Sequence, residues 1–192
     1  MNRRLLLALL GPTLLLACTG PELREPVDVT SARPPLVFAV AEKLVEEEGQ
    51  LPAAAQFRDR QRTDRLRNGT RTFLDDRLQT TSGLGWLRVT IQDARILEEE
   101  VATVGGIRGV FTREPDRVLD ALVRVRIAVM GADGLEQANV ETEVQRRRPV
   151  LQGTSVIAQD AEVERLIGDL MGQLDDQLTQ AVRQHLGGFL LL

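Results

Sequence analysis

Two stretches in the middle of the chain repeat apolar residues at every second position. Apolar side chains occupy every second position from Leu119 to Val129, and the alternation resumes from Ala138 to Val144. A two-residue period places one face of a strand on a core and the other face in water. The Gly-Ala-Asp-Gly segment at 131–134 is typical of a turn. The pattern predicts a long β-hairpin, with arginine facing outward on one strand and glutamate on the other, which favours cross-strand pairing.

Two further segments have the character of strands. Leu87, Val89 and Ile91 alternate with polar residues, which predicts a half-buried strand. The apolar run at 36–41 predicts a buried strand that continues towards Val45, although so short a run is also compatible with a helix.

Two segments repeat their apolar side chains every three to four residues, which is the period of a helix. The first segment covers 64–78. Its apolar face comprises Leu66, Thr70, Phe73, Leu74 and Leu78. The second begins at Asp160, a fair N-cap, and ends at Gly187-Gly188. Its apolar face comprises Val163, Leu166, Ile167, Leu170, Met171, Leu174, Leu178, Ala181, Val182 and His185.

These elements predict an α+β fold class with the order β-α-β-β-β-α. We expect a two-layer sandwich in which two helices lie on one face of a largely antiparallel sheet. A single domain covers 36–188, and 189–192 is an apolar C-terminal tail too short to span a bilayer. Residues 19–35 contain four prolines and no apolar period, which is typical of an extended tether.

The N-terminal segment has the three-part layout of a secretory signal peptide. A basic start, Met1 to Arg4, is followed by the apolar stretch Leu5 to Leu16 and then by small residues. The apolar stretch is shorter than the roughly 20 residues that a membrane-spanning helix needs. The layout predicts that 1–17 is removed as a signal peptide.

The sequence Leu-Leu-Ala-Cys at 15–18 resembles the lipobox of bacterial lipoproteins. The resemblance implies that the peptide is cut before Cys18, that Cys18 carries lipid, and that 18–35 forms a lipidated N-terminus and tether. In many Gram-negative bacteria an aspartate after the cysteine retains a lipoprotein in the inner membrane. Thr19 stands there instead, so the analogy places the protein in the cell envelope, on the outer membrane and facing the periplasm. An ordinary signal peptide with a chance cysteine and a cytosolic protein with a hydrophobic N-terminal helix are the alternatives.

Charge and composition narrow the classes of partner. The formal net charge of the chain is −4, and removing Arg3 and Arg4 with the signal peptide makes it −6. This acidic balance argues against a nucleic-acid partner. Cys18 is the only cysteine, so the domain depends on its hydrophobic core and has no disulfide. The lack of tyrosine and the single tryptophan argue against an aromatic-rich carbohydrate site.

The sequence predicts no catalytic residue, no cofactor and no metal. The lone histidine, His185, falls on the apolar face of the last helix, where a packed or partly exposed core histidine is expected rather than a catalytic base. Asp75-Asp76 and Asp175-Asp176 are adjacent pairs in helices. Their side chains diverge by about 100°, so we interpret both pairs as solvated helix faces.

Two other patterns could bind a ligand. The glutamate triplets at 46–48 and 98–100 would bracket a divalent cation if their strands were neighbours, but two solvated strand ends are the simpler interpretation. The Gly-Gly-Ile-Arg-Gly segment at 105–109 is interpreted as a surface loop, because no helix is signalled directly after it to complete a phosphate site.

Arginines cluster before and within the first helix and again after the hairpin. The candidates for contact with anions are Arg58, Arg62, Arg65, Arg146, Arg147 and Arg148. Guanidinium groups match phosphate and carboxylate geometry, and the phosphates of an envelope compartment include phospholipid and lipopolysaccharide headgroups. The alternative is that acidic neighbours neutralise the first cluster on an ordinary helix surface. Those neighbours are Asp59, Asp64, Asp75 and Asp76.

Three functions therefore stay open. We expect a non-catalytic accessory lipoprotein, anchored to the membrane through its N-terminal lipid, that holds a protein partner in an envelope transport or assembly machine. A lipobox, a short tether and a small α+β domain loosely resemble the auxiliary lipoproteins of envelope ABC-type lipid transporters and the lipopolysaccharide-assembly lipoproteins. That resemblance concerns architecture, so it assigns no functional residue. The second function is a lipid- or lipopolysaccharide-binding module that uses the arginines, and the third is an envelope hydrolase.

Overall fold

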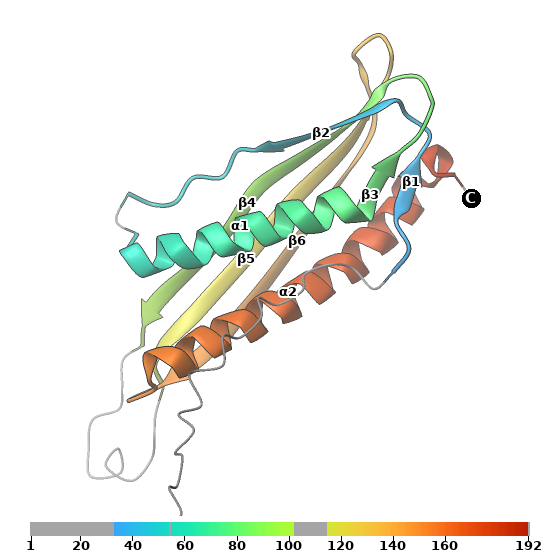
Figure 1. Cartoon of the computed structure of the whole chain (residues 1–192). Coiled ribbons are helices and arrows are strands. Elements are labelled where there is room, and N and C mark those ends of the chain that lie inside the picture. Colours follow the sequence, from blue (N-terminus) through green and yellow to red (C-terminus); the bar gives the residue numbers. More distant parts are fainter. Residues whose placement is uncertain (1–32, 54, 102–114, 192) are drawn as a thin grey trace, which may run out of the picture.

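The computed structural model describes residues 33–53, 55–101 and 115–191 of the chain. Its elements, in chain order, are β1 (Leu36–Phe38), β2 (Glu42–Glu47), α1 (Phe57–Arg77), β3 (Leu78–Thr80), β4 (Trp86–Glu100), β5 (Pro115–Met130), β6 (Glu136–Leu151), α2 (Val156–His185) and the short 3₁₀-helix η2 (Gly187–Phe189). Strands β2, β4, β5 and β6 form one sheet, and both helices lie on one of its faces (Figure 1). The predicted two-layer α+β fold is confirmed.

The long hairpin forms one side of this sheet, with β6 at the edge. β5 and β6 are antiparallel neighbours, β4 pairs with the other side of β5, and the edge strand β2 runs parallel to β4. The predicted apolar positions of β5 face the helices, and each is at most 1% exposed. Charge pairing across the hairpin is also confirmed, since Arg124 contacts Glu143 directly opposite and Arg126 lies 2.8 Å from a Glu136 carboxylate oxygen.

The prediction of one continuous strand from 36 towards Val45 is wrong. β1 and β2 are separate strands in different sheets, because β1 pairs in parallel with β3 and β2 pairs in parallel with β4. The chain bends between them, where Gly83 packs so closely that a Cβ there would lie 2.2 Å from the Ala39 carbonyl oxygen. Val40 is buried at this bend. The apolar run therefore fills the core around a corner instead of along one strand.

Helix α1 begins seven residues earlier than the predicted segment. Gln56 and Asp59 form a capping box at its start, and the early turns bury polar side chains that leave no apolar period to detect. The predicted apolar face from Leu66 to Leu78 is confirmed, because all five of its residues are at most 1% exposed.

Helix α2 begins before the predicted N-cap, Asp160, which is therefore the wrong residue. Ser155 is the N-cap, and its hydroxyl oxygen accepts a hydrogen bond from the Ala158 backbone N–H at 3.3 Å. His185, for which a packed or partly exposed position is expected, is exposed rather than packed. Leu186 and Val182 occupy the core at that end of the helix instead.

The C-terminal residues return to the first strand. The Ala39 N–H donates to the Phe189 carbonyl oxygen, and the Leu191 N–H donates to the Val37 carbonyl oxygen, both at 2.8 Å. Phe189 and Leu190 pack against the core. None of the described helices combines the length and the apolar character needed to cross a bilayer. The signal peptide, Cys18, most of the tether and the segment 105–109 lie outside the described residues.

Candidate functional site

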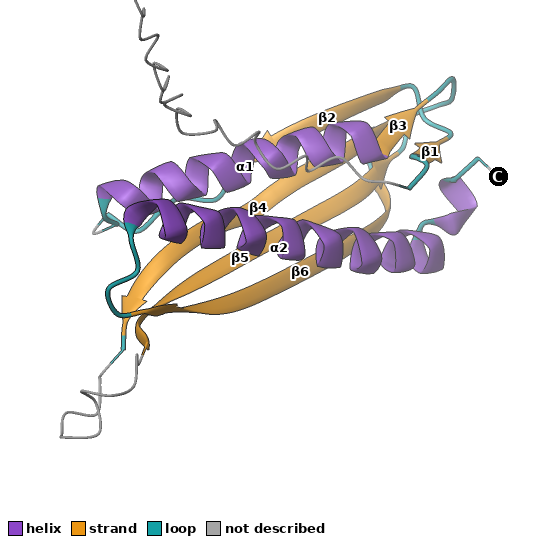
Figure 2. Cartoon of the chain, turned by 60° about the horizontal axis from the view of Figure 1, so that its bottom comes forward, coloured by secondary structure: helices purple, strands orange, loops and turns teal. Residues whose placement is uncertain are grey.

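The structure brings the first three candidate arginines to one place. Arg58, Arg62 and Arg65 follow one side of α1 at spacings of four and three residues. They line a hollow of about 100 Å³ together with residues of the first turns of α2, Val156 and Gln159 among them. The two helices begin side by side at the same end of the molecule (Figure 2). The candidate site is therefore the gap between two helix N-termini.

Arg62 is committed to the fold. It is 3% exposed, and its Nη1 donates to a carboxylate oxygen of Glu98 in β4 at 2.5 Å. Arg117 in β5 donates to the other oxygen of Glu98 at 2.8 Å. Burial opposes ionisation of Glu98, but hydrogen bonds from Arg62 and Arg117 outweigh burial and lower the pKa of its carboxyl below the ordinary glutamate value. Arg62 thus joins α1 to the sheet.

Arg65 and Arg58 differ from Arg62 in exposure and in their partners. The Arg65 side chain is 45% exposed, and it donates to Glu164 at 2.8 Å. Arg58 is exposed and makes no hydrogen bond or ion pair with any described residue. Gln159 of α2 is 4% exposed, and its Oε1 has no partner among the described residues. The hollow therefore holds one uncommitted cation and one uncommitted amide oxygen.

The second arginine cluster does not form a single patch. Because side chains alternate along β6, Arg147 lies on the face without helices, 2.5 Å from Glu99, while Arg148 turns towards α2. Arg148 donates to Glu162 at 3.0 Å and to Asp169 at 2.6 Å. The hydrogen bond from Arg148 is the main reason that the pKa of Glu162 is lowered. Arg146 is exposed and makes no ion pair within the described part of the chain.

The two glutamate triplets do not meet. β2 and β4 are neighbours, as a shared cation site would require, but Glu47 lies opposite Ile91. Glu98 is further along β4 and is bound by arginines. Among the described residues, no group of three or more histidine, cysteine, aspartate or glutamate side chains is arranged to hold a metal ion.

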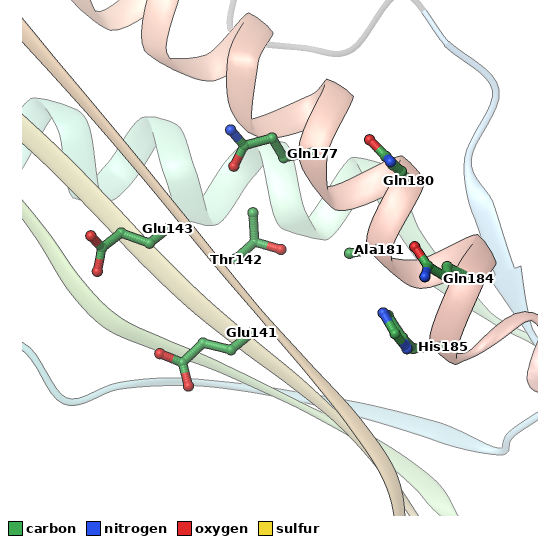
Figure 3. Close-up of a pocket in the computed structure, with 8 residues that line it drawn as sticks. All are labelled: Glu141, Thr142, Glu143, Gln177, Gln180, Ala181, Gln184 and His185. Carbon is green, nitrogen blue, oxygen red and sulfur yellow. The ribbon is translucent and has the colours of Figure 1, made fainter.

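A second hollow, of about 270 Å³, runs between β6 and the C-terminal half of α2 (Figure 3). Gln177, Gln180, Gln184 and His185 line its helix side. Thr142 points towards α2, whereas its neighbours in β6 point to the other side of the strand. The helix side of this hollow is polar and largely uncharged, which is typical of a solvated groove.

Sequence reasoning missed the buried ion pair between Arg77 and Asp175. Arg77, at the end of α1, is 2% exposed; its Nε donates to Asp175 at 2.7 Å and its Nη2 donates to the Thr179 hydroxyl at 2.8 Å. Its Nη1 donates to the Pro34 carbonyl oxygen. The interpretation of Asp175 as solvated is therefore wrong, whereas Asp176 is exposed. The available signal was that Asp175 falls inside the apolar stripe of α2.

No protein-family model and no curated protein matches the chain. Three similar solved structures are a neuraminyllactose-binding hemagglutinin homologue from Helicobacter pylori, lipoprotein B from Nitrosomonas europaea and rare lipoprotein B from Shewanella oneidensis. Their identities are 8%, 15% and 14%, and their TM-scores are 0.44, 0.39 and 0.38. The alignments cover 77%, 80% and 75% of this chain and 90%, 91% and 95% of those chains. At these scores the likeness carries no argument about what the chain does.

Proposed function

We propose that this chain is a lipid-anchored envelope lipoprotein that serves as a non-catalytic accessory subunit, holding a protein partner in an envelope transport or assembly machine. The observation that carries the proposal is the lipobox at 15–18, which follows a basic start and an apolar stretch. Two or more acyl chains on Cys18 hold a protein stably at a membrane, whereas one chain holds it only marginally. Thr19 supports a position on the outer membrane, facing the periplasm.

The fold supports the partner-holding part of this proposal. Both helices pack on the same face of the main sheet (Figure 2), so the described elements leave the opposite face uncovered. That face carries ion pairs such as Arg124 with Glu143, and Arg88 stacks 4.8 Å from the centre of the Trp86 ring. A broad polar face with a half-buried arginine–aromatic pair has the character of a protein interface.

The anchor is tested by Cys18→Ser in cells fed a radiolabelled fatty acid. We expect the label to disappear and uncut precursor to accumulate, because the hydroxyl cannot form the thioether. A variant that is cut and retained in the membrane like the parent would contradict the lipoprotein assignment. Mild crosslinking of the parent in the envelope then tests the accessory role, which predicts recovery of a stable protein partner.

A module that binds anionic lipid or lipopolysaccharide is the second candidate function. The observation in its favour is Arg58, which faces the hollow between the helix N-termini without a carboxylate partner among the described residues. Positive helix ends and free guanidinium groups both favour phosphate oxygens.

A further inference from the structure

The end of the domain at which both helices begin exposes large apolar side chains. Phe57 is the first residue of α1 and is 74% exposed. Val156 and Ile157 are the first two residues of α2 and are 54% and 75% exposed. The hollow that Val156 shares with Arg58 places the two helix starts next to each other. Apolar side chains gathered at one tip of a domain mark a contact surface.

In the first turn of each helix, the exposed charges have one sign. The first turn of α2 contains no acidic residue, and the only acid in the first turn of α1, Asp59, is 4% exposed. Arg58 and Arg60 are the exposed charged residues of these two turns. The helices run in the same direction, so their positive dipole ends add at this tip (Figure 2). The outermost turns are therefore apolar and cationic, although the chain as a whole is acidic. Asp160, which follows the first turn of α2, is exposed, and its carboxylate lies 3.8 Å from Arg65.

We propose that this tip docks on the surface of an anionic phospholipid bilayer. Phe57, Val156 and Ile157 enter the region between headgroups and acyl chains, and Arg58 and Arg60 contact headgroup phosphates. Basic residues beside exposed apolar side chains are the combination that holds proteins at membrane interfaces. The inference rests on the proposed function only in taking the bilayer as the surface to which Cys18 is anchored.

The length of the tether permits this orientation. Arg33 is held against α2 by an ion pair with Asp176 at 2.5 Å. From Asp176 the start of α2 is about 30 Å away, because a helix rises about 1.5 Å per residue. The chain between Cys18 and Arg33 can extend to about 50 Å. An anchor at Cys18 therefore leaves enough chain for the tip to reach the same bilayer.

The opposite end of the molecule supplies a matched control. Leu135 lies in the turn between β5 and β6 and is 67% exposed, comparable to Ile157. It lies about 50 Å from the tip, since β6 has 16 residues with a rise of about 3.3 Å each. Asp133 and Glu136 flank it, so this end is apolar but acidic.

The test places an environment-sensitive dye on Ile157→Cys or on Leu135→Cys in the full chain, purified after processing and reconstituted into vesicles of phosphatidylethanolamine and phosphatidylglycerol. We expect a blue shift with higher emission at position 157 and none at position 135. Arg58→Gln and Arg60→Gln should each lower the ratio of docked to undocked protein about fivefold, because one basic residue near an anionic surface contributes about 1 kcal/mol. Replacing phosphatidylglycerol by phosphatidylcholine should reduce the shift.

Three outcomes would overturn the proposal: no shift at position 157, an equal shift at position 135, or a shift at 157 that persists unchanged without anionic lipid. The parent chain separates this failure from failure of the proposed function. If the dye reacts with Cys18 and the parent does not float with the vesicles, the lipid anchor is absent. If the parent floats and position 157 stays in water, the anchor stands and only the docking tip is wrong.

Discussion

Arg58 and Arg77 carry the same side chain at the two ends of α1, but only Arg77 is enclosed by the fold. Around Arg77 the sequence supplies Asp175, Thr179 and the Pro34 carbonyl oxygen, and its guanidinium donates to all three. Arg58 makes no ion pair with a described residue, and it shares its hollow with the exposed Val156 and with Asp160, whose carboxylate lies 3.8 Å from Arg65. Arg77 therefore stabilises the fold at the C-terminal end of α1, whereas the charge of Arg58 is exposed to solvent at the N-terminal end.

Arg62 shows how local this difference is. It follows Arg58 by one helical turn, yet it is buried and paired with Glu98. The partner comes from β4, which is distant in the sequence, so tertiary contacts decide which arginines are available to a ligand. A run of arginines in a sequence is therefore no measure of the charge that a surface presents.

The largest expected effect is at the enclosed end. Arg77→Ala leaves the Asp175 carboxylate in a nearly buried site without its main partner, so we expect the free energy of unfolding to fall by about 3–5 kcal/mol. Arg58→Ala, at an exposed site, should change it by less than about 0.5 kcal/mol. Urea denaturation of both variants measures the contrast. Equal losses would show that Arg77 is not the structural arginine of the pair.

A double variant sharpens this prediction. Arg77→Met with Asp175→Leu removes both charges, so the desolvated carboxylate no longer exists. We expect it to recover much of the loss seen for Arg77→Ala, because apolar residues of similar volume often replace a buried ion pair at little cost. Failure to recover would indicate that Thr179 and the Pro34 carbonyl oxygen, rather than Asp175, carry the dependence on Arg77.

Arg62→Ala should have an intermediate effect. Glu98 would keep its hydrogen bond from Arg117, so the loss should be about 1–3 kcal/mol, smaller than for Arg77→Ala. The same denaturation series measures it. A loss as small as that of Arg58→Ala would mean that the junction between α1 and β4 does not depend on this pair.

The sequence predicts a feature when the residues that determine it are close together in the chain. The hairpin and the apolar faces of both helices were predictable, because burial on one face imposes a period that neighbours in the chain already show. The bend at 39–41 was not, because it depends on the close approach of Gly83 from a distant segment. The helix starts were missed for a related reason: Gln56 and Ser155 cap segments whose first turns are polar or exposed. The burial of Asp175 depends on Arg77, almost a hundred residues earlier.

A smaller effect is expected for the loss of stability in acid, which depends on Glu98, the partner of the buried Arg62. The pKa of Glu98 is lowered in the folded protein, so its ionised form stabilises the fold above the unfolded pKa of about 4.3. That contribution is lost as the pH falls through the lower, folded value. Between pH 6 and pH 3, the midpoint temperature of thermal unfolding should therefore fall less steeply for Glu98→Gln than for the parent. If the midpoint temperatures of the two proteins fall in parallel, the acid dependence does not come from Glu98.

The smallest effect is expected at Arg58, at the exposed start of α1. It distinguishes an arginine that binds a ligand from an ordinary surface residue. Residues 19–192, made without signal peptide or lipid, should bind anionic vesicles weakly, and the binding should weaken as salt rises, because screening acts over about 10 Å at 0.1 M ionic strength. Arg58→Gln should weaken it about fivefold with no loss of stability. Arg183→Gln is the matched control, since Arg183 is also exposed and makes no ion pair with a described residue, but lies in the last turn of α2. The net charge of the fragment opposes binding, so any attraction must come from a local surface.

Equal losses of vesicle binding for Arg58→Gln and Arg183→Gln would mean that the vesicles sense overall charge rather than the tip. If the parent fragment shows no salt-sensitive binding, the protein-holding role is the proposal to pursue.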